Sequence, residues 1–300
     1  MLVVRKCALV LAALLATSAT QACSVCIAHA FGAGIHAIGS QTLHKGATVV
    51  GISYTTFSKS QAGEDPGTTE SHDQHEIGLD VLHSLNDQLM LRANVPYVVK
   101  QLSMTGEEDI NTRGLGDITL GAKYQFKPRP ADKVLLSASF DLKLPTGQNN
   151  LKDAVGDRLE EHSQLGTGST DFSLGLVATM EDPGKGLWFA GLRGRWNGKN
   201  KEDYRYGNAL FYNIGYSKTL DPGAAVIFEL NGRFAGKDRT ESGEKDENSG
   251  GHFGYLSLSY RRDIGKELGF VAAYQIPVFR RLNGSQSESG LLTIGFFRKV

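Results

Sequence analysis

The sequence predicts an all-β protein, an antiparallel transmembrane β-barrel of about 12 strands that follows a cleaved signal peptide. Apolar and polar residues alternate with a period of two from Ala47 onward, as they do in β-strands. The connections between these segments alternate between long and short. The composition, with 36 Gly and only 8 Pro, also fits a β-rich chain better than a helical one. The 32 Lys and Arg balance the 32 Asp and Glu, so no net field attracts nucleic acid.

Residues 1–22 have the pattern of a secretory signal peptide. Arg5 and Lys6 form a short positive region, an apolar stretch follows, and Thr20 and Ala22 are small residues at the cleavage site. The apolar stretch is too short to span a membrane. Cleavage after Ala22 places Cys23 at the new N-terminus, so lipidation of this cysteine is one alternative.

The segment 23–42 is predicted to be a periplasmic extension that contains Cys23, Cys26, His29 and His36. We favour a Cys23–Cys26 disulfide, because secreted proteins meet an oxidising compartment. Thiolates and imidazoles at this spacing also suit Zn or Cu, and a redox-active pair is a third alternative. Haem attachment is excluded, because Ile27 follows the second cysteine where a histidine is needed.

Residues 43–300 are predicted to form the barrel. The long connections fall near 60–72, 105–115, 147–167, 198–207, 237–250 and 281–289, and the short ones near 85–88, 127–132, 181–186, 219–223 and 262–267. Bacterial outer-membrane barrels have an even number of strands, short periplasmic turns and long outer loops. This pattern predicts an outer-membrane location with both termini in the periplasm. A secreted β-sandwich fits less well, since its loop lengths need not alternate.

If the apolar faces point to lipid, the polar faces line the lumen. Two interpretations of the lumen charges stay open: a ladder of ion pairs, such as Lys143 with Asp141, or a pore constriction that favours anions. The predicted lumen anions are Glu76, Asp80, Asp141 and Glu229. The predicted lumen cations, which with Glu229 mark the solute path, are Arg92, Lys123, Lys143, Arg193, Arg195, Arg233 and Arg261.

The sequence carries no pattern typical of an enzyme or of a resident cofactor. His72 and His75 do not have the spacing of a zinc protease, and a nucleophile elbow and a phosphate-binding loop are both missing. In a strand, two histidines three residues apart point to opposite faces. We therefore expect no catalytic residues and no cofactor.

Several short motifs stand out along the predicted barrel: 114–124 (GLGDITLGAKY), 143–147 (KLPTG), 166–171 (GTGSTD) and 274–278 (YQIPV). Together they resemble one family of outer-membrane barrels, named for the meta-pathway of phenol degradation. Gly114 and Gly116 would provide backbone freedom where a loop meets a strand, and Asp117 would cap that entry or pair with a lumen cation. The motif residues of interest are Gly116, Asp117, Pro145, Gly147, Asp171 and Pro277.

The resemblance implies a passive outer-membrane channel for small solutes, among them aromatic compounds or organic anions. Its partners would be outer-membrane lipid and a small-molecule solute. The alternative function is a membrane scaffold that docks a metal- or electron-handling periplasmic partner at residues 23–42.

Overall fold

The computed structural model describes residues 39–62, 67–127, 133–183 and 185–300. The predicted signal peptide and Cys23, Cys26, His29 and His36 lie outside the described residues. Their disulfide, metal, redox and lipid alternatives therefore stay predictions, as does a scaffold function that depends on them.

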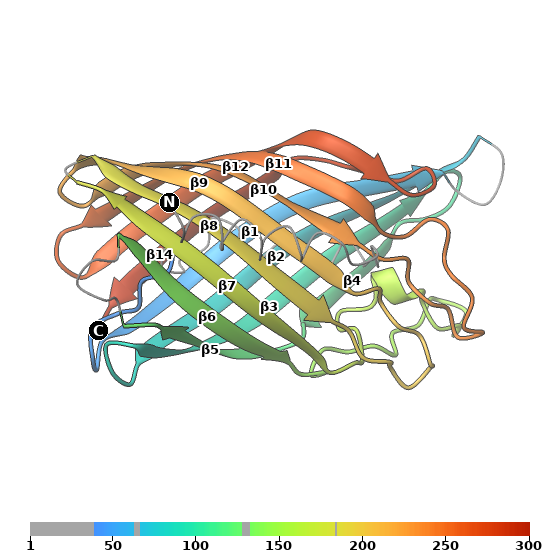
Figure 1. The fold of residues 1–300 in the computed structure, drawn as a ribbon. Coiled ribbons are helices and arrows are strands. Elements are labelled where there is room, and N and C mark those ends of the chain that lie inside the picture. Colours follow the sequence, from blue (N-terminus) through green and yellow to red (C-terminus); the bar gives the residue numbers. More distant parts are fainter. Residues whose placement is uncertain (1–38, 63–66, 128–132, 184) are drawn as a thin grey trace, which may run out of the picture.

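The described chain folds into one closed antiparallel β-barrel (Figure 1). Its strands are β1 (Thr48–Ala62), β2 (Thr69–Ser84), β3 (Leu89–Met104), β4 (Ile110–Leu115), β5 (Thr119–Gln125), β6 (Val134–Lys143), β7 (Asp171–Asp182), β8 (Gly186–Trp196), β9 (Ala209–Asp221), β10 (Ala224–Ala235), β11 (Gly251–Ile264), β12 (Leu268–Leu282), β13 (Ser287–Glu288) and β14 (Leu291–Lys299).

Of these 14 strands, β4 and β5 both pair with β3, and β13 and β14 both pair with β1, so each couple forms one barrel strand. Twelve barrel strands remain, as predicted, and β1 closes the barrel by pairing with β2 and β14. The described residues contain one short 3-10 helix, η1 (Glu161–Ser163), and no helix long and apolar enough to cross a membrane.

Three long loops, 144–170, 197–208 and 236–250, lie at one end of the barrel, as predicted (Figure 1). The other three predicted long loops, 60–72, 105–115 and 281–289, are shorter than expected, because β1 and β2 extend to Ala62 and Thr69, β4 occupies Ile110–Leu115, and β12 extends to Leu282. These strand ends are polar on both faces, so the apolar period that marks a strand is lost there. The first strand begins and the last strand ends at the short-turn end of the barrel, where the Thr48 amide donates to the carbonyl oxygen of Val300.

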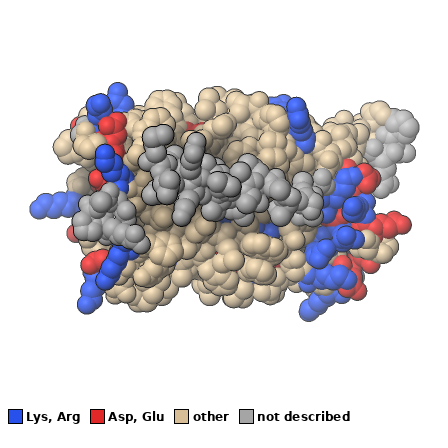
Figure 2. Space-filling model, in the orientation of Figure 1, with Lys and Arg blue, Asp and Glu red and all other residues tan. Residues whose placement is uncertain are grey.

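The apolar faces of the strands point outward, as the alternation predicted. Leu136, Leu174 and Leu176 are at least half exposed, whereas Ser137 and Ser173 beside them are buried. Charged side chains gather at the two ends of the barrel, and an uncharged belt separates them on the visible face (Figure 2). Aromatic rings pack at both edges of this belt, in the pairs Phe172–Trp196 and Trp188–Tyr216. This surface is that of a membrane barrel with interfacial aromatic girdles.

Two β-bulges interrupt the barrel wall, each beside a proline. Between Tyr97↔Leu115 and Asn94↔Thr119, β3 contributes two residues and the β4–β5 junction contributes three, so the wall bulges opposite Pro96. A second bulge follows Pro277, where Gly254 pairs with Phe279 and Tyr255 pairs with Pro277. Proline donates no ladder hydrogen bond and is tolerated at such positions. The first bulge brings Asp117 to the inner face of the barrel.

Candidate functional site

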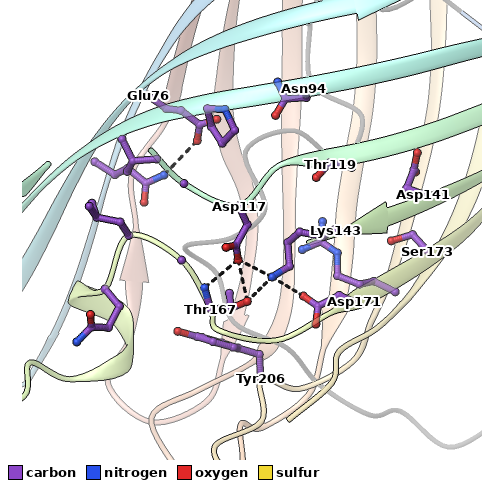
Figure 3. A pocket seen from close by; sticks show the side chains of 18 of the residues that line it. Glu76, Asn94, Asp117, Thr119, Asp141, Lys143, Thr167, Asp171, Ser173 and Tyr206 are labelled. Carbon is purple, nitrogen blue, oxygen red and sulfur yellow. Dashed lines mark hydrogen bonds and ion pairs between the residues drawn. The ribbon is translucent and has the colours of Figure 1, made fainter. Parts of the chain in front are cut away.

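A cavity of about 170 Å³ lies in the lumen near the long-loop end (Figure 3). Its wall consists of inward side chains of β2, β3 and β5 to β8. The loop between β6 and β7 contributes Gln164, Leu165, Gly166 and Thr167, and the next long loop contributes Tyr206. The charged residues of the lining are Glu76, Arg92, Lys100, Asp117, Asp141, Lys143, Asp171, Arg193 and Arg195.

One row of paired residues carries three of these charges around the wall. Arg92 pairs in register with Gly121, Gly121 with Asp141, Asp141 with Ser173, and Ser173 with Arg195. Because Gly121 has no side chain, Arg92 reaches across β5 and donates to Asp141 at 2.6 Å. Asp141 therefore pairs with Arg92, two strands away, and not with Lys143, the partner given from the sequence as an example of an ion pair.

Lys143 belongs instead to a compact cluster around Asp117, on the inner face below the long loops (Figure 3). The Lys143 ammonium lies 2.7 Å from the Asp117 carboxylate and 2.9 Å from that of Asp171. Asp117 also accepts the backbone N–H groups of Gly147 at 3.0 Å and of Thr167 at 2.8 Å. Asp117 thus pairs with a lumen cation, one of the two roles anticipated from the sequence, and the N–H groups that it accepts belong to the loop between β6 and β7. We call Asp117, Lys143, Thr167 and Asp171 the wall cluster.

Glycines allow the backbones around the wall cluster to touch. A Cβ atom on Gly147 would lie 2.8 Å from the Cα of Gly166 and 2.9 Å from the carbonyl carbon of Gly116. Gly116 was expected to supply backbone freedom, but its φ is not positive. Close packing against Pro96 and Val98 better explains why this position is a glycine. Gly114 does have a positive φ of 157°. Strand β6 ends at Lys143, and Pro145 lies just beyond this end. This position suits proline, because a residue without an N–H group cannot donate to the hydrogen bonds between strands.

Three sequence motifs, at 114–117, 143–147 and 166–171, therefore meet at one point of the wall. The profile of the family described as the MetA-pathway of phenol degradation matches residues 75–256, which include all three motifs. The chain belongs to this family.

Solved structures of other outer-membrane barrels share the fold of this chain. An outer membrane channel from Pseudomonas putida F1 is 16% identical, with 89% of this chain and 100% of that chain covered and a TM-score of 0.69. The translocator domain of the autotransporter NalP from Neisseria meningitidis is 12% identical, with 86% and 90% covered and a TM-score of 0.54. No curated protein sequence matches the chain. The structural likeness establishes the outer-membrane barrel fold.

Four of the eight predicted solute-path residues lie away from the cavity. Lys123 donates to the carbonyl oxygens of Gly39 and Gln41 at 2.6 and 2.8 Å, so it holds the chain that precedes β1 against the barrel interior. Glu229 accepts from Asn213 at 2.7 Å, Arg233 pairs with Glu288, and Arg261 lies 3.2 Å from Asp263. These contacts stabilise the wall. The other four solute-path residues, Arg92, Lys143, Arg193 and Arg195, line the cavity together with the predicted lumen anions Glu76 and Asp141.

The remaining predicted anions have polar neighbours. Asp80 accepts from Asn94 at 2.9 Å, and Glu76 lines the cavity beside Gln74. The two histidines of the first hairpin point to opposite faces, as predicted: His72 is buried, whereas His75 faces outward and bonds the Tyr54 hydroxyl at 2.8 Å.

The loop between β6 and β7 folds into the mouth of the barrel, which the sequence analysis did not anticipate. Residues 161–167 of this loop are buried. The Lys100 ammonium donates to the carbonyl oxygen of His162 at 2.8 Å, and the Tyr206 hydroxyl donates to that of Glu161 at 2.8 Å. Leu159, Leu165, Tyr204 and Tyr206 are buried apolar residues within otherwise polar loops, and this contrast is the signal that could have revealed the fold.

Ionisable groups lie buried where this loop meets its neighbours. Asp238 accepts the Gly207 N–H at 2.9 Å and the Tyr204 hydroxyl at 2.8 Å. Burial nevertheless raises the pKa of Asp238 to about 7. Burial also lowers the pKa of His162 well below its usual range. The mouth of the barrel thus holds charges that are costly to bury without a counter-ion.

Proposed function

We propose that this protein is an outer-membrane channel for the passive diffusion of small solutes, not an enzyme. The observation that carries the proposal is the combination of an apolar, aromatic-edged outer belt with a charged cavity in the lumen. Membership of the family and the fold it shares with an outer membrane channel from Pseudomonas putida F1 support it. In this proposal the rim of the barrel with the short turns faces the periplasm, as in other bacterial barrels. The first strand begins and the last strand ends at this rim.

The charges of the cavity favour small organic anions, including aromatic ones. Five cationic residues and four anionic ones line it. Arg92, Asp141 and Arg195 share one row of the wall, so two arginines flank a single carboxylate. Charges of one sign on low-dielectric walls focus the field and raise the local concentration of the opposite ion. Tyr206 adds an aromatic surface that suits a ring-bearing solute.

Uptake into proteoliposomes tests this proposal. Benzoate and benzylamine have similar size and opposite charge, so their relative uptake reports charge preference with little effect of shape. We expect benzoate to enter faster than benzylamine and both to enter faster than into liposomes without protein. Equal uptake with and without protein would contradict the channel function, and faster entry of benzylamine would contradict the preference for anions.

A further inference from the structure

A first group of metal-ligating side chains lies where the β1–β2 hairpin meets the loop between β6 and β7. Glu70, His72 and Glu160 place one ligand atom each within 4.8 Å of one another. The His72 Nε2 atom lies 2.5 Å from Glu70 and 3.6 Å from Glu160. Glu70 also accepts from Gln61 at 2.9 Å, which orients its carboxylate. Glu160 is partly exposed, so this group is open to solvent.

A second group lies beside the first and joins two long loops. His162, Asp238 and Asp246 also place their ligand atoms within 4.8 Å of one another. The His162 Nε2 atom is 3.6 Å from the Asp238 carboxylate. The rings of His72 and His162 pack edge to face with their centroids 6.4 Å apart, so the two groups are neighbours. We call these six residues the mouth cluster.

Within the mouth cluster, His72 and Glu70 form a hydrogen bond at 2.5 Å, whereas two other contacts have the spacing of metal ligands. The two 3.6 Å separations between imidazole nitrogen and carboxylate oxygen exceed hydrogen-bond length. Two ligands that bind zinc at about 2.0–2.1 Å with tetrahedral angles lie about 3.3 Å apart. The first site therefore requires His72 and Glu70 to move apart by somewhat less than about 1 Å, and small side-chain shifts would complete the second. Imidazole with carboxylate is also a donor set that zinc and its neighbours accept.

The mouth cluster has an excess of negative groups. It combines four carboxylates with two imidazoles, and the nearby cations are Lys59, which is 2% exposed, and Lys100, whose ammonium lies 2.8 Å from the His162 carbonyl oxygen. The charge of Lys59 acts on Glu70, Glu160, His162 and Asp238, so this side chain lies between the two groups. Two ammonium groups do not balance four carboxylates in a partly buried site. A divalent cation would complete the balance, with Lys59 as its competitor.

We infer that the outer mouth of the barrel binds divalent transition-metal ions of the zinc class at Glu70–His72–Glu160 and at His162–Asp238–Asp246. Bound ions would tie the loop between β6 and β7 to the β1–β2 hairpin on one side and to the loop 236–250 on the other. This binding does not depend on the proposed channel function, because it requires only the observed positions of the ligands.

Cobalt(II) titration of the purified full-length protein in detergent tests the inference. Co²⁺ adopts zinc-like geometry, and its visible absorption reports coordination. We expect the wild type to bind up to two more ions than the H72A/H162A variant, with one ion lost in each single variant. Equal binding by the wild type and H72A/H162A would overturn the inference. His83→Ala is the matched control, because His83 lies at the short-turn end and bonds Thr48. The heat-modifiable gel mobility of folded barrels verifies that each variant folds.

Two further readouts place the ions. The mouth cluster contains no cysteine, so its Co²⁺ must lack the thiolate charge-transfer band that the predicted Cys23–Cys26 segment would give. A thiolate band on all the bound cobalt would overturn the placement. Lys59→Met removes a competing charge, and we expect it to tighten binding at least tenfold, because a unit charge and a divalent ion less than about 10 Å apart repel by more than a tenfold change requires at an effective dielectric constant near 20. Unchanged affinity in this variant would place the ions elsewhere.

Discussion

The wall cluster and the mouth cluster both hold buried charges on the inside of the barrel, but they satisfy those charges differently. In the wall cluster, Lys143 lies between two aspartates, and Asp117 also accepts two backbone N–H groups. In the mouth cluster, carboxylates outnumber cations, and two ligand pairs stand 3.6 Å apart. The first arrangement is complete within the protein, whereas the second has capacity for an external cation.

The difference follows from where each cluster lies in the chain. The wall cluster is built from strand ends and glycine contacts, so its backbone has little freedom. The mouth cluster is assembled mainly from loop side chains, which can shift to admit a ligand. The wall cluster holds the base of the β6–β7 loop rigidly, and the mouth cluster gives the outer part of this loop adjustable contacts. This combination suits a loop that narrows the lumen.

The largest effect we expect is from Asp117→Ala. This change leaves the Lys143 ammonium with Asp171 alone and removes the acceptor of the Gly147 and Thr167 N–H groups. Breaking such a buried pair costs about 3–5 kcal/mol. Urea-induced unfolding in detergent, followed by heat-modifiable mobility, measures the loss. A free energy of unfolding within about 1 kcal/mol of wild type would show that the wall cluster does not lock the loop.

A slightly smaller effect is expected from substitutions on the outer face of the barrel. Both clusters can lie inside the barrel only if this face points to lipid. Leu176 is 61% exposed in the middle of β7, and Leu220 is 54% exposed near the end of β9. Leu176→Arg should cost about 2–4 kcal/mol in lipid, and Leu220→Arg about 0–1 kcal/mol, because the penalty depends on depth. Unfolding from lipid vesicles measures both. Equal costs would contradict the assignment of β7 to the centre of the membrane.

The mouth cluster should tolerate the loss of one charge. Glu160 is partly exposed and contributes to an excess of carboxylates, so Glu160→Gln should change the free energy of unfolding by less than about 1 kcal/mol without metal. The same urea titration, run beside Asp117→Ala, gives the comparison directly. A loss as large as that of Asp117→Ala would mean that the mouth cluster is as rigidly paired as the wall cluster.

The orientation of the mouth cluster can be checked by labelling. Asn150 and Glu244 are polar residues of the two long loops that carry parts of the cluster. A cysteine at either position should react with an impermeant thiol reagent on intact cells, whereas one at Asp87, in a short turn, should react only after the outer membrane is opened. The reverse pattern would place the mouth cluster in the periplasm.

The sequence predicts the strands, their outward faces and six of the charged cavity residues, because alternation with a period of two fixes which face each side chain occupies. It does not predict which charges pair. Asp141 reaches Arg92 because the register places Gly121 between them, and register between strands is not visible in one sequence. The inward fold of residues 161–167 is missed for a related reason, since loops carry no period.

The central claim is that the arginines of the cavity give the channel its preference for anions. The reversal potential of the channel in a planar bilayer under a salt gradient measures this most directly. Wild type should show selectivity for anions, and R193S/R195S should shift the reversal potential toward zero, while Arg261→Ser, which lies away from the cavity, should leave it unchanged. An unchanged reversal potential in a folded, conducting R193S/R195S variant would contradict the claim.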